Sequence, residues 1–78
     1  MLIRVEGLPD DISELQLLRA FQLYGVVARV EFRIDRFSRG KPVGFVEMPE
    51  ASEGELAIRS LRGVSWGIRS VGLYRVAD

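Results

Sequence analysis

The 78-residue chain contains no cysteine and no histidine. The absence of cysteine excludes a disulfide framework and thiolate ligation of a metal, and the absence of histidine removes the commonest general base and a frequent zinc ligand. Excess charge is also missing, because eleven basic and eleven acidic residues give a formal net charge of zero. No apolar run is long enough to cross a bilayer. We therefore expect no metal site, no cofactor and no membrane partner.

The acidic residues that could serve an enzyme have a simpler explanation. Asp10 and Asp11 precede one helical pattern, and Glu53 and Glu55 lie near the start of another. Carboxylates are stabilised there by the positive end of the helix dipole. No strand pattern is followed by a loop with the glycines, lysine and spacing that bind phosphate. We therefore do not expect an enzyme.

The cations are concentrated although the net charge is zero. Ten of the eleven basic residues are arginine. One short stretch contains five cations and only two acids, Glu31 and Asp35; the cations are Arg29, Arg33, Arg36, Arg39 and Lys41. A neutral protein can thus present a positive edge to a polyanion.

Alternation of apolar and polar residues predicts four strands. They span residues 2–6, 27–34, 43–48 and 71–76, and the second and third should form a hairpin. The residues expected to face inward are Ile3 and Val5; Val30, Phe32 and Ile34; Gly44, Val46 and Met48; and Val71 and Leu73.

Two further segments have the spacing of amphipathic helices. The first spans about residues 14–24, with a capping box of Ser13 and Gln16 at its start and Gly25 as a left-handed stop. The second spans about residues 49–62. The stripes expected to face inward are Leu17, Ala20, Phe21 and Tyr24 in the first helix and Gly54, Ala57, Ile58 and Leu61 in the second.

The predicted order is βαββαβ, an α+β, ferredoxin-like arrangement in which a four-stranded antiparallel sheet carries both helices on one face. A chain of this length buries one modest core, so we expect a single domain over residues 1–78. The other sheet face should be open, and function is expected there. By alternation this open face carries Arg4, Glu6, Arg29, Glu31, Arg33, Lys41, Val43, Phe45, Glu47 and Tyr74.

Two of the predicted strands resemble the signature strands of a known family, the RNA recognition motif. They read Ile3-Arg4-Val5-Glu6-Gly7-Leu8-Pro9 and Lys41-Pro42-Val43-Gly44-Phe45-Val46-Glu47-Met48. The resemblance covers nearly the whole chain and implies single-stranded RNA as the partner. Where the family stacks bases on aromatic rings, this chain has Arg4, Val43 and Phe45.

A closer likeness is to the quasi-RNA-recognition motifs of heterogeneous nuclear ribonucleoproteins F and H. Their first strand also carries arginine at the stacking position and continues Gly-Leu-Pro. Gly40-Lys41-Pro42 is similar to their Gly-Arg-Pro, and residues 66–74 run parallel to their closing segment. Loops hold guanine runs in those relatives, although Asp10 stands where they place an aromatic residue. This resemblance implies binding assisted by loops.

The missing rings should weaken binding. Stacking a base on an aromatic ring is worth about 1–3 kcal/mol, so two absent rings remove roughly 2–6 kcal/mol, or about thirtyfold to ten-thousandfold in affinity. Arg4 can recover part of this by stacking its guanidinium on a base. We expect Phe45 and Tyr74 to lie under bases; the other RNA-binding candidates are Arg4, Arg33, Val43 and the loop residues Arg36, Phe37, Arg39 and Lys41.

These positions also have structural interpretations. The open-face cations Arg4, Arg29 and Arg33 alternate with Glu6 and Glu31. They could form only cross-strand ion pairs, without any role in RNA binding. Tyr74 could pack its ring on an outer strand while its hydroxyl stays in water.

A protein-interaction module on the same fold is the main alternative. Some family members bind peptide through an Arg-x-Phe motif after the second helix, and Trp66 falls where that phenylalanine would lie. Val64 replaces the arginine of the motif, which favours Trp66 as part of the core. Leu15, Leu18 and Leu23 on the outer side of the first helix could instead contact a protein partner or form a homodimer.

A regulatory small-ligand domain has the same topology and stays open. Met1 is followed directly by a strand pattern, without a basic and then apolar leader. We therefore expect an intracellular module, nuclear or cytoplasmic.

Overall fold

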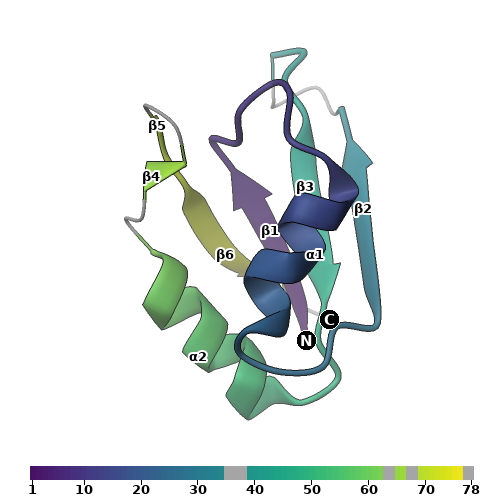
Figure 1. Ribbon diagram of the computed structural model, residues 1–78, viewed down its shortest axis with the longest axis vertical. Helices are drawn as coiled ribbons and strands as arrows, with labels where there is room; N and C mark the ends of the chain where they lie inside the picture. Colours follow the sequence, from purple (N-terminus) through teal and green to yellow (C-terminus); the bar gives the residue numbers. More distant parts are fainter. Residues whose placement is uncertain (35–38, 63–64, 67–68, 77–78) are drawn as a thin grey trace.

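A computed structural model describes residues 1–34, 39–62, 65–66 and 69–76; of residues 65–66 and 69–70 it describes the backbone (Figure 1). Its main elements are β1 (Leu2–Glu6), α1 (Glu14–Gln22), β2 (Arg29–Arg33), β3 (Val43–Glu47), α2 (Ala51–Leu61) and β6 (Gly72–Val76). A short hairpin of β4 (Ser65–Trp66) and β5 (Arg69–Ser70), absent from the sequence prediction, precedes β6. The βαββαβ fold is confirmed.

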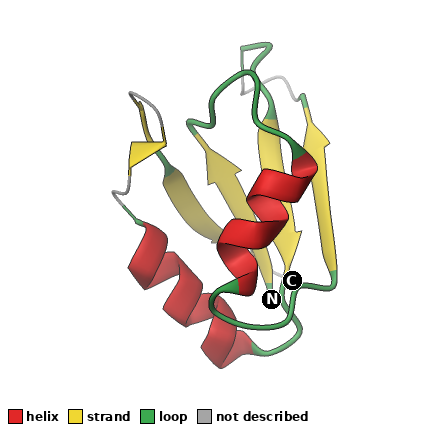
Figure 2. Cartoon of the chain, viewed as in Figure 1, coloured by secondary structure: helices red, strands yellow, loops and turns green. Residues whose placement is uncertain are grey.

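Both helices cover the same face of the sheet, so the fold has two layers and the other face of the sheet is open (Figure 2). Its strand order is β2-β3-β1-β6, and every neighbouring pair is antiparallel. β1 and β3 are therefore the central strands, and β2 and β6 lie at the two edges of this sheet. No helix among the described residues is long and apolar enough to cross a membrane.

The core lies between the helices and the covered face of the sheet. Ile3 and Val5 of β1 and Leu17 and Phe21 of α1 are completely buried. The predicted stripe of α2 is confirmed, since the buried residues of this helix are Gly54, Ala57, Ile58 and Leu61. Gly44 also faces the helices, because a Cβ there would lie 2.7 Å from Cδ2 of Leu17. The inward parity predicted for the strands is therefore correct at these positions.

The first helix begins as predicted. The Ser13 N–H donates to Gln16 Oε1 at 2.8 Å, and the Gln16 N–H donates to Ser13 Oγ at 3.1 Å. This reciprocal capping box satisfies two backbone donors that a helix start leaves without partners.

The prediction for the end of this helix was wrong. α1 ends at Gln22, and Gly25 does not have a positive φ, which among the described glycines occurs at Gly7 and Gly40. A Cβ at Gly25 would instead collide with the side chain of Glu53, whose Oε1 accepts the Val26 N–H at 3.0 Å. Glycine is therefore favoured at position 25 by the close approach of α2.

The inward position predicted for Ile34 was also wrong. β2 ends at Arg33, one residue earlier than the alternation indicated, and Ile34 is 70% exposed. Beyond the last paired residue, the pleat no longer determines which face a side chain takes.

Candidate nucleic-acid interface

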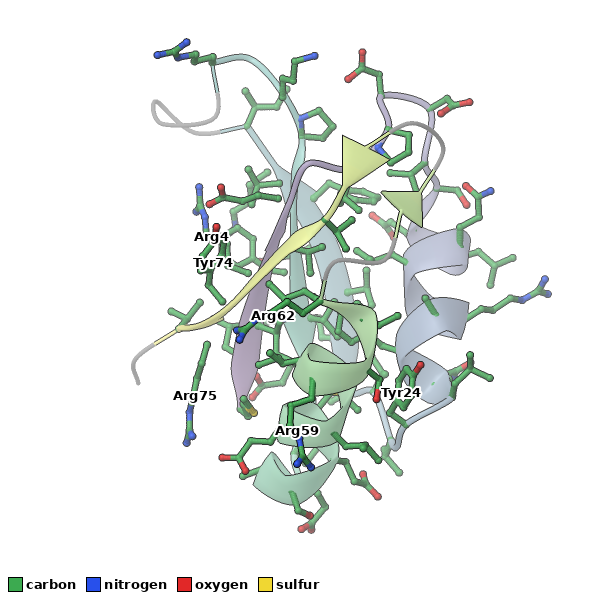
Figure 3. All side chains as sticks on the ribbon, turned by 90° about the vertical axis from the view of Figure 1, so that its left-hand side faces the viewer. Arg4, Tyr24, Arg59, Arg62, Tyr74 and Arg75 are labelled. Carbon is green, nitrogen blue, oxygen red and sulfur yellow. The ribbon has the colours of Figure 1, made fainter. Side chains whose placement is uncertain are left out.

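One row of side chains crosses the open face of the sheet. The strand registers place Glu31 opposite Phe45, Phe45 opposite Arg4, and Arg4 opposite Tyr74. Directly opposed residues in an antiparallel sheet point to the same face. Figure 3 shows Arg4 and Tyr74 on the side of the sheet away from the helices. The pairing thus brings four of the residues expected on the open face into one line.

Two arginines cover the ring of Phe45 from neighbouring strands. The guanidinium carbon of Arg4 lies 5.6 Å from the ring centroid, and that of Arg33 lies 5.1 Å from it. Both distances are within the range of a cation–π interaction. We call Arg4, Phe45 and Arg33 the arginine clamp. The contact between Arg33 and Phe45 was not foreseen from the sequence, although both residues have the parity of the open face.

A carboxylate holds each arginine of the clamp. Arg4 Nε donates to Glu6 Oε2 at 2.6 Å, and Arg33 Nη2 donates to Glu31 Oε1 at 2.6 Å. Both ion pairs lie within a single strand, β1 or β2, and not between strands as the sequence analysis considered. They position the guanidinium groups over the ring. The side chain of Arg4 is 21% exposed and that of Arg33 is 61% exposed. Arg33 is thus the more solvent-accessible of the two arginines in the clamp.

The charges carried by the strands on the open face balance. Three arginines, Arg4, Arg29 and Arg33, share it with three glutamates, which are Glu6, Glu31 and Glu47. A net attraction for the phosphate backbone therefore has to come from residues outside the strands.

Tyr74 lies on the edge strand β6 and is exposed to solvent on the open face. It is 52% exposed, and its ring lies along the strand over Gly72, where an added Cβ would approach the hydroxyl oxygen to 3.0 Å. The small residue at position 72 therefore leaves room for this orientation of the ring.

Val43 is placed differently from the other candidates. It lies opposite Arg33 in the register but is only 2% exposed, and it is not part of the main core cluster. Its side chain is therefore almost completely shielded from solvent, and its role in RNA binding stays a prediction.

The basic loop is described in part. Arg36 and Phe37 lie outside the described residues. Arg39 and Lys41 are exposed, and Lys41 Nζ lies 3.7 Å from Asp10 Oδ1 in the loop after β1. Arg39 has a φ of 55°, a conformation that costs a non-glycine residue roughly 1–2 kcal/mol. Two loops therefore meet beside the end of the open face.

The residues proposed for protein interaction do not form one surface. Leu15 and Leu18 line a mostly apolar groove of about 500 Å³ between α1 and β2; its other lining residues are Glu14, Val27, Ala28, Arg29 and Val30. Leu23 is 79% exposed but is not part of this groove. The side chain of Trp66 lies outside the described residues. Sequence reasoning missed the contribution of β2, because a groove depends on the distance between two elements.

The described residues contain no group of three histidine, cysteine, aspartate or glutamate side chains that could hold a metal ion. This finding applies to the described ranges alone.

Comparison with known proteins agrees with the fold of the chain. The RNA recognition motif family matches residues 3–70. RbpA of Synechocystis sp. and RbpB of Nostoc sp., both named as candidate RNA-binding proteins, are each 40% identical over 67 residues. These matches cover 85% of this chain but 66% and 65% of the relatives, so the chain spans slightly less than two thirds of their length.

Solved structures show the same fold. The crystal structure of RNA Binding Protein PG1 superposes with a TM-score of 0.86 at 28% identity, covering 100% of this chain and 95% of that one. The Rna15 RRM with bound RNA (GU) gives a TM-score of 0.83 at 22% identity, covering 99% and 83%. The family match extends over most of the chain and includes both central strands, so the chain belongs to the RNA recognition motif family.

Proposed function

We propose that the chain is a single-stranded RNA-binding module that binds weakly through its open face and is assisted by the loop before β3. The observation that carries the proposal is the arginine clamp, in which a half-buried aromatic ring on a central strand lies beneath two guanidinium groups. Both the ring and the guanidinium planes can stack on a base. The names of the relatives RbpA and RbpB support RNA as the ligand.

A base can reach Phe45 by replacing Arg33. Moving this arginine forfeits an exposed cation–π contact, worth about 0.5–1 kcal/mol, and an exposed ion pair, worth about 0.2–1 kcal/mol. Stacking the base gains about 1–3 kcal/mol. The net gain per base is therefore small, which is the physical reason to expect weak binding. The released guanidinium can then bind a phosphate.

Loop cations supply the attraction that the balanced face lacks. Arg39 and Lys41 are exposed beside the end of the face, and Arg36 and Phe37 are their neighbours in sequence. This arrangement supports the likeness to the quasi-RNA-recognition motifs, in which loops grip the strand. A single intracellular domain over residues 1–78, nuclear or cytoplasmic, is part of the same proposal.

An amide-shift NMR titration tests the proposal. Short GU-repeat oligonucleotides are suitable probes, because the Rna15 RRM was solved with bound RNA (GU). We expect shifts at Arg4, Phe45 and residues 39–41, while Arg59 on the outer side of α2 should stay unchanged. Absence of shifts across the sheet and the loop at millimolar RNA would refute it.

A further inference from the structure

The outer edge of β2 is an open strand edge. β2 pairs with β3 on one side, and no described strand pairs with its other side. Unpaired backbone groups on such an edge are a ready template for another strand. Proteins often protect these edges with inward-pointing charges, proline or a covering element. In the described part of the chain, the side chains that β2 and its flanking residues direct towards the helices are apolar, so no inward-pointing charge protects this edge.

The apolar residues around β2 are symmetric about Val30. Ala28, Val30 and Phe32 occupy every second position, and all three are apolar. If a second copy paired antiparallel to β2 about a twofold axis at Val30, Ala28 would oppose Phe32, and Val30 would oppose its own mate. Val26 and Ile34 lie beyond the two ends of β2 and are 64% and 70% exposed in the single chain. This arrangement would bring the two apolar ends of the strands near one another.

The charges on the other side of the strand are compatible with the same register. A twofold axis at Val30 places Arg29 of each copy opposite Glu31 of the other, which makes two attractive pairs. An axis at Glu31 would oppose like charges, namely glutamate with itself and Arg29 with Arg33. An axis at Phe32 would also make attractive pairs, between Glu31 and Arg33, but Ala28 would then have no partner within β2. The axis at Val30 matches the charges and also keeps Ala28 opposite Phe32.

The groove beside α1 lies next to this axis. Leu15 is 51% exposed, and together with Leu18 and Val27 it lines the groove that also includes Val30. In the arrangement centred on Val30 the two grooves would lie on either side of the axis, on the helix side of the joined sheet. Burial of these leucines would add apolar area to the strand pairing.

We propose that β2 and the groove formed by Leu15, Leu18, Val27 and Val30 are a homodimer surface, occupied by the same elements of a second copy. The twofold axis is perpendicular to the sheet, so the two four-stranded sheets join into one of eight strands. Both open faces then lie on the same side. Two arginine clamps would thereby form one continuous surface, on which a single RNA strand could be bound by both copies and gain avidity.

Sedimentation equilibrium of the 78-residue chain over a range of concentrations tests this proposal without RNA. We expect the mass to rise from 8.8 kDa towards twice that value. Arg29→Glu and Glu31→Arg should each weaken the dimer by roughly tenfold or more, because each turns both attractive pairs into repulsive ones. The double variant should restore it. A monomer at all concentrations up to millimolar, or single variants that dimerise as the parent does, would overturn the proposal.

A cysteine crosslink gives a second measurement that tolerates variants with impaired folding. The chain has no native cysteine, so Val30→Cys introduces one thiol that would face its own mate across the axis. Opposed residues of an antiparallel pair are close enough for a disulfide. Mild oxidation should crosslink Val30→Cys and leave Leu56→Cys, on the outer surface of α2, monomeric. Equal crosslinking of the two variants would contradict this interface.

Discussion

Replacing Phe45 by alanine should separate the stability of the fold from its binding function. Phe45 lies on the open face, so its removal leaves no cavity between the sheet and the helices. The loss in free energy of unfolding should come mainly from the two contacts of the ring with Arg4 and Arg33, at 5.6 Å and 5.1 Å. At about 0.5–1 kcal/mol each, these sum to roughly 1–2 kcal/mol. A phenylalanine buried in the core would cost about 3–5 kcal/mol.

The same substitution should have a larger relative effect on RNA binding. Loss of one stacking platform is worth about 1–3 kcal/mol, which corresponds to a decrease in affinity of about fivefold to 150-fold. Phe45→Leu is the matched control, because leucine keeps an apolar side chain on the strand but has no aromatic face. We expect Phe45→Leu to lose most of the affinity and less of the stability.

Two assays measure these quantities independently. Urea denaturation gives the free energy of unfolding, with an unchanged m-value as the check that the folded state is intact. Fluorescence anisotropy with a labelled GU-repeat oligonucleotide at constant salt gives the affinity. If the folded Phe45→Ala variant binds within about twofold of the parent, the ring is not a stacking platform and the mechanism is refuted.

Three further predictions concern the fold and the loop. Gly44→Ala should cost about 1–3 kcal/mol of stability, because the new Cβ would lie 2.7 Å from a methyl carbon of Leu17; an unchanged melting temperature would contradict this packing. Ser13→Ala should lower the stability by about 1 kcal/mol through loss of the helix cap, whereas Ser13→Asp should retain most of it in the same melting experiment. The logarithm of RNA affinity should fall with the logarithm of salt concentration at a slope of about −0.7 per phosphate contact. Lys41→Gln should make this slope about 0.7 shallower and Arg59→Gln should leave it unchanged; equal slopes in all three proteins would argue against a role for the loop.

The fold could be predicted because each element carries its own local pattern. Alternation in residues 2–6 and the spacing of Gly54, Ala57, Ile58 and Leu61 each determine one buried face, and the capping box marks the start of α1. The ends of elements were less predictable. Gly25 was expected to stop a helix through its own backbone freedom, whereas the structure relates this glycine to Glu53, which is distant in sequence.

The open face was predictable as a set of residues but not as an arrangement. Alternation places Arg4, Arg33, Phe45 and Tyr74 on one face, as the registers confirm. The register alone decides which of them are neighbours, and rotamers decide that both arginines lie over one ring. The low exposure of Val43 could not be predicted either, because alternation assigns a side chain to one face of the sheet but does not determine how much of it is exposed there.

By itself, the sequence determined the family, the order of the elements and the composition of the open face, because these depend on local periodicity and on residues at fixed spacing. The tertiary structure decided how the open face is organised. It joined Phe45 to two arginines held by carboxylates, and it left the edge of β2 open beside an apolar groove. Both features arise between elements that are distant in the chain, where strand pairing and helix packing fix the distances that no local pattern contains.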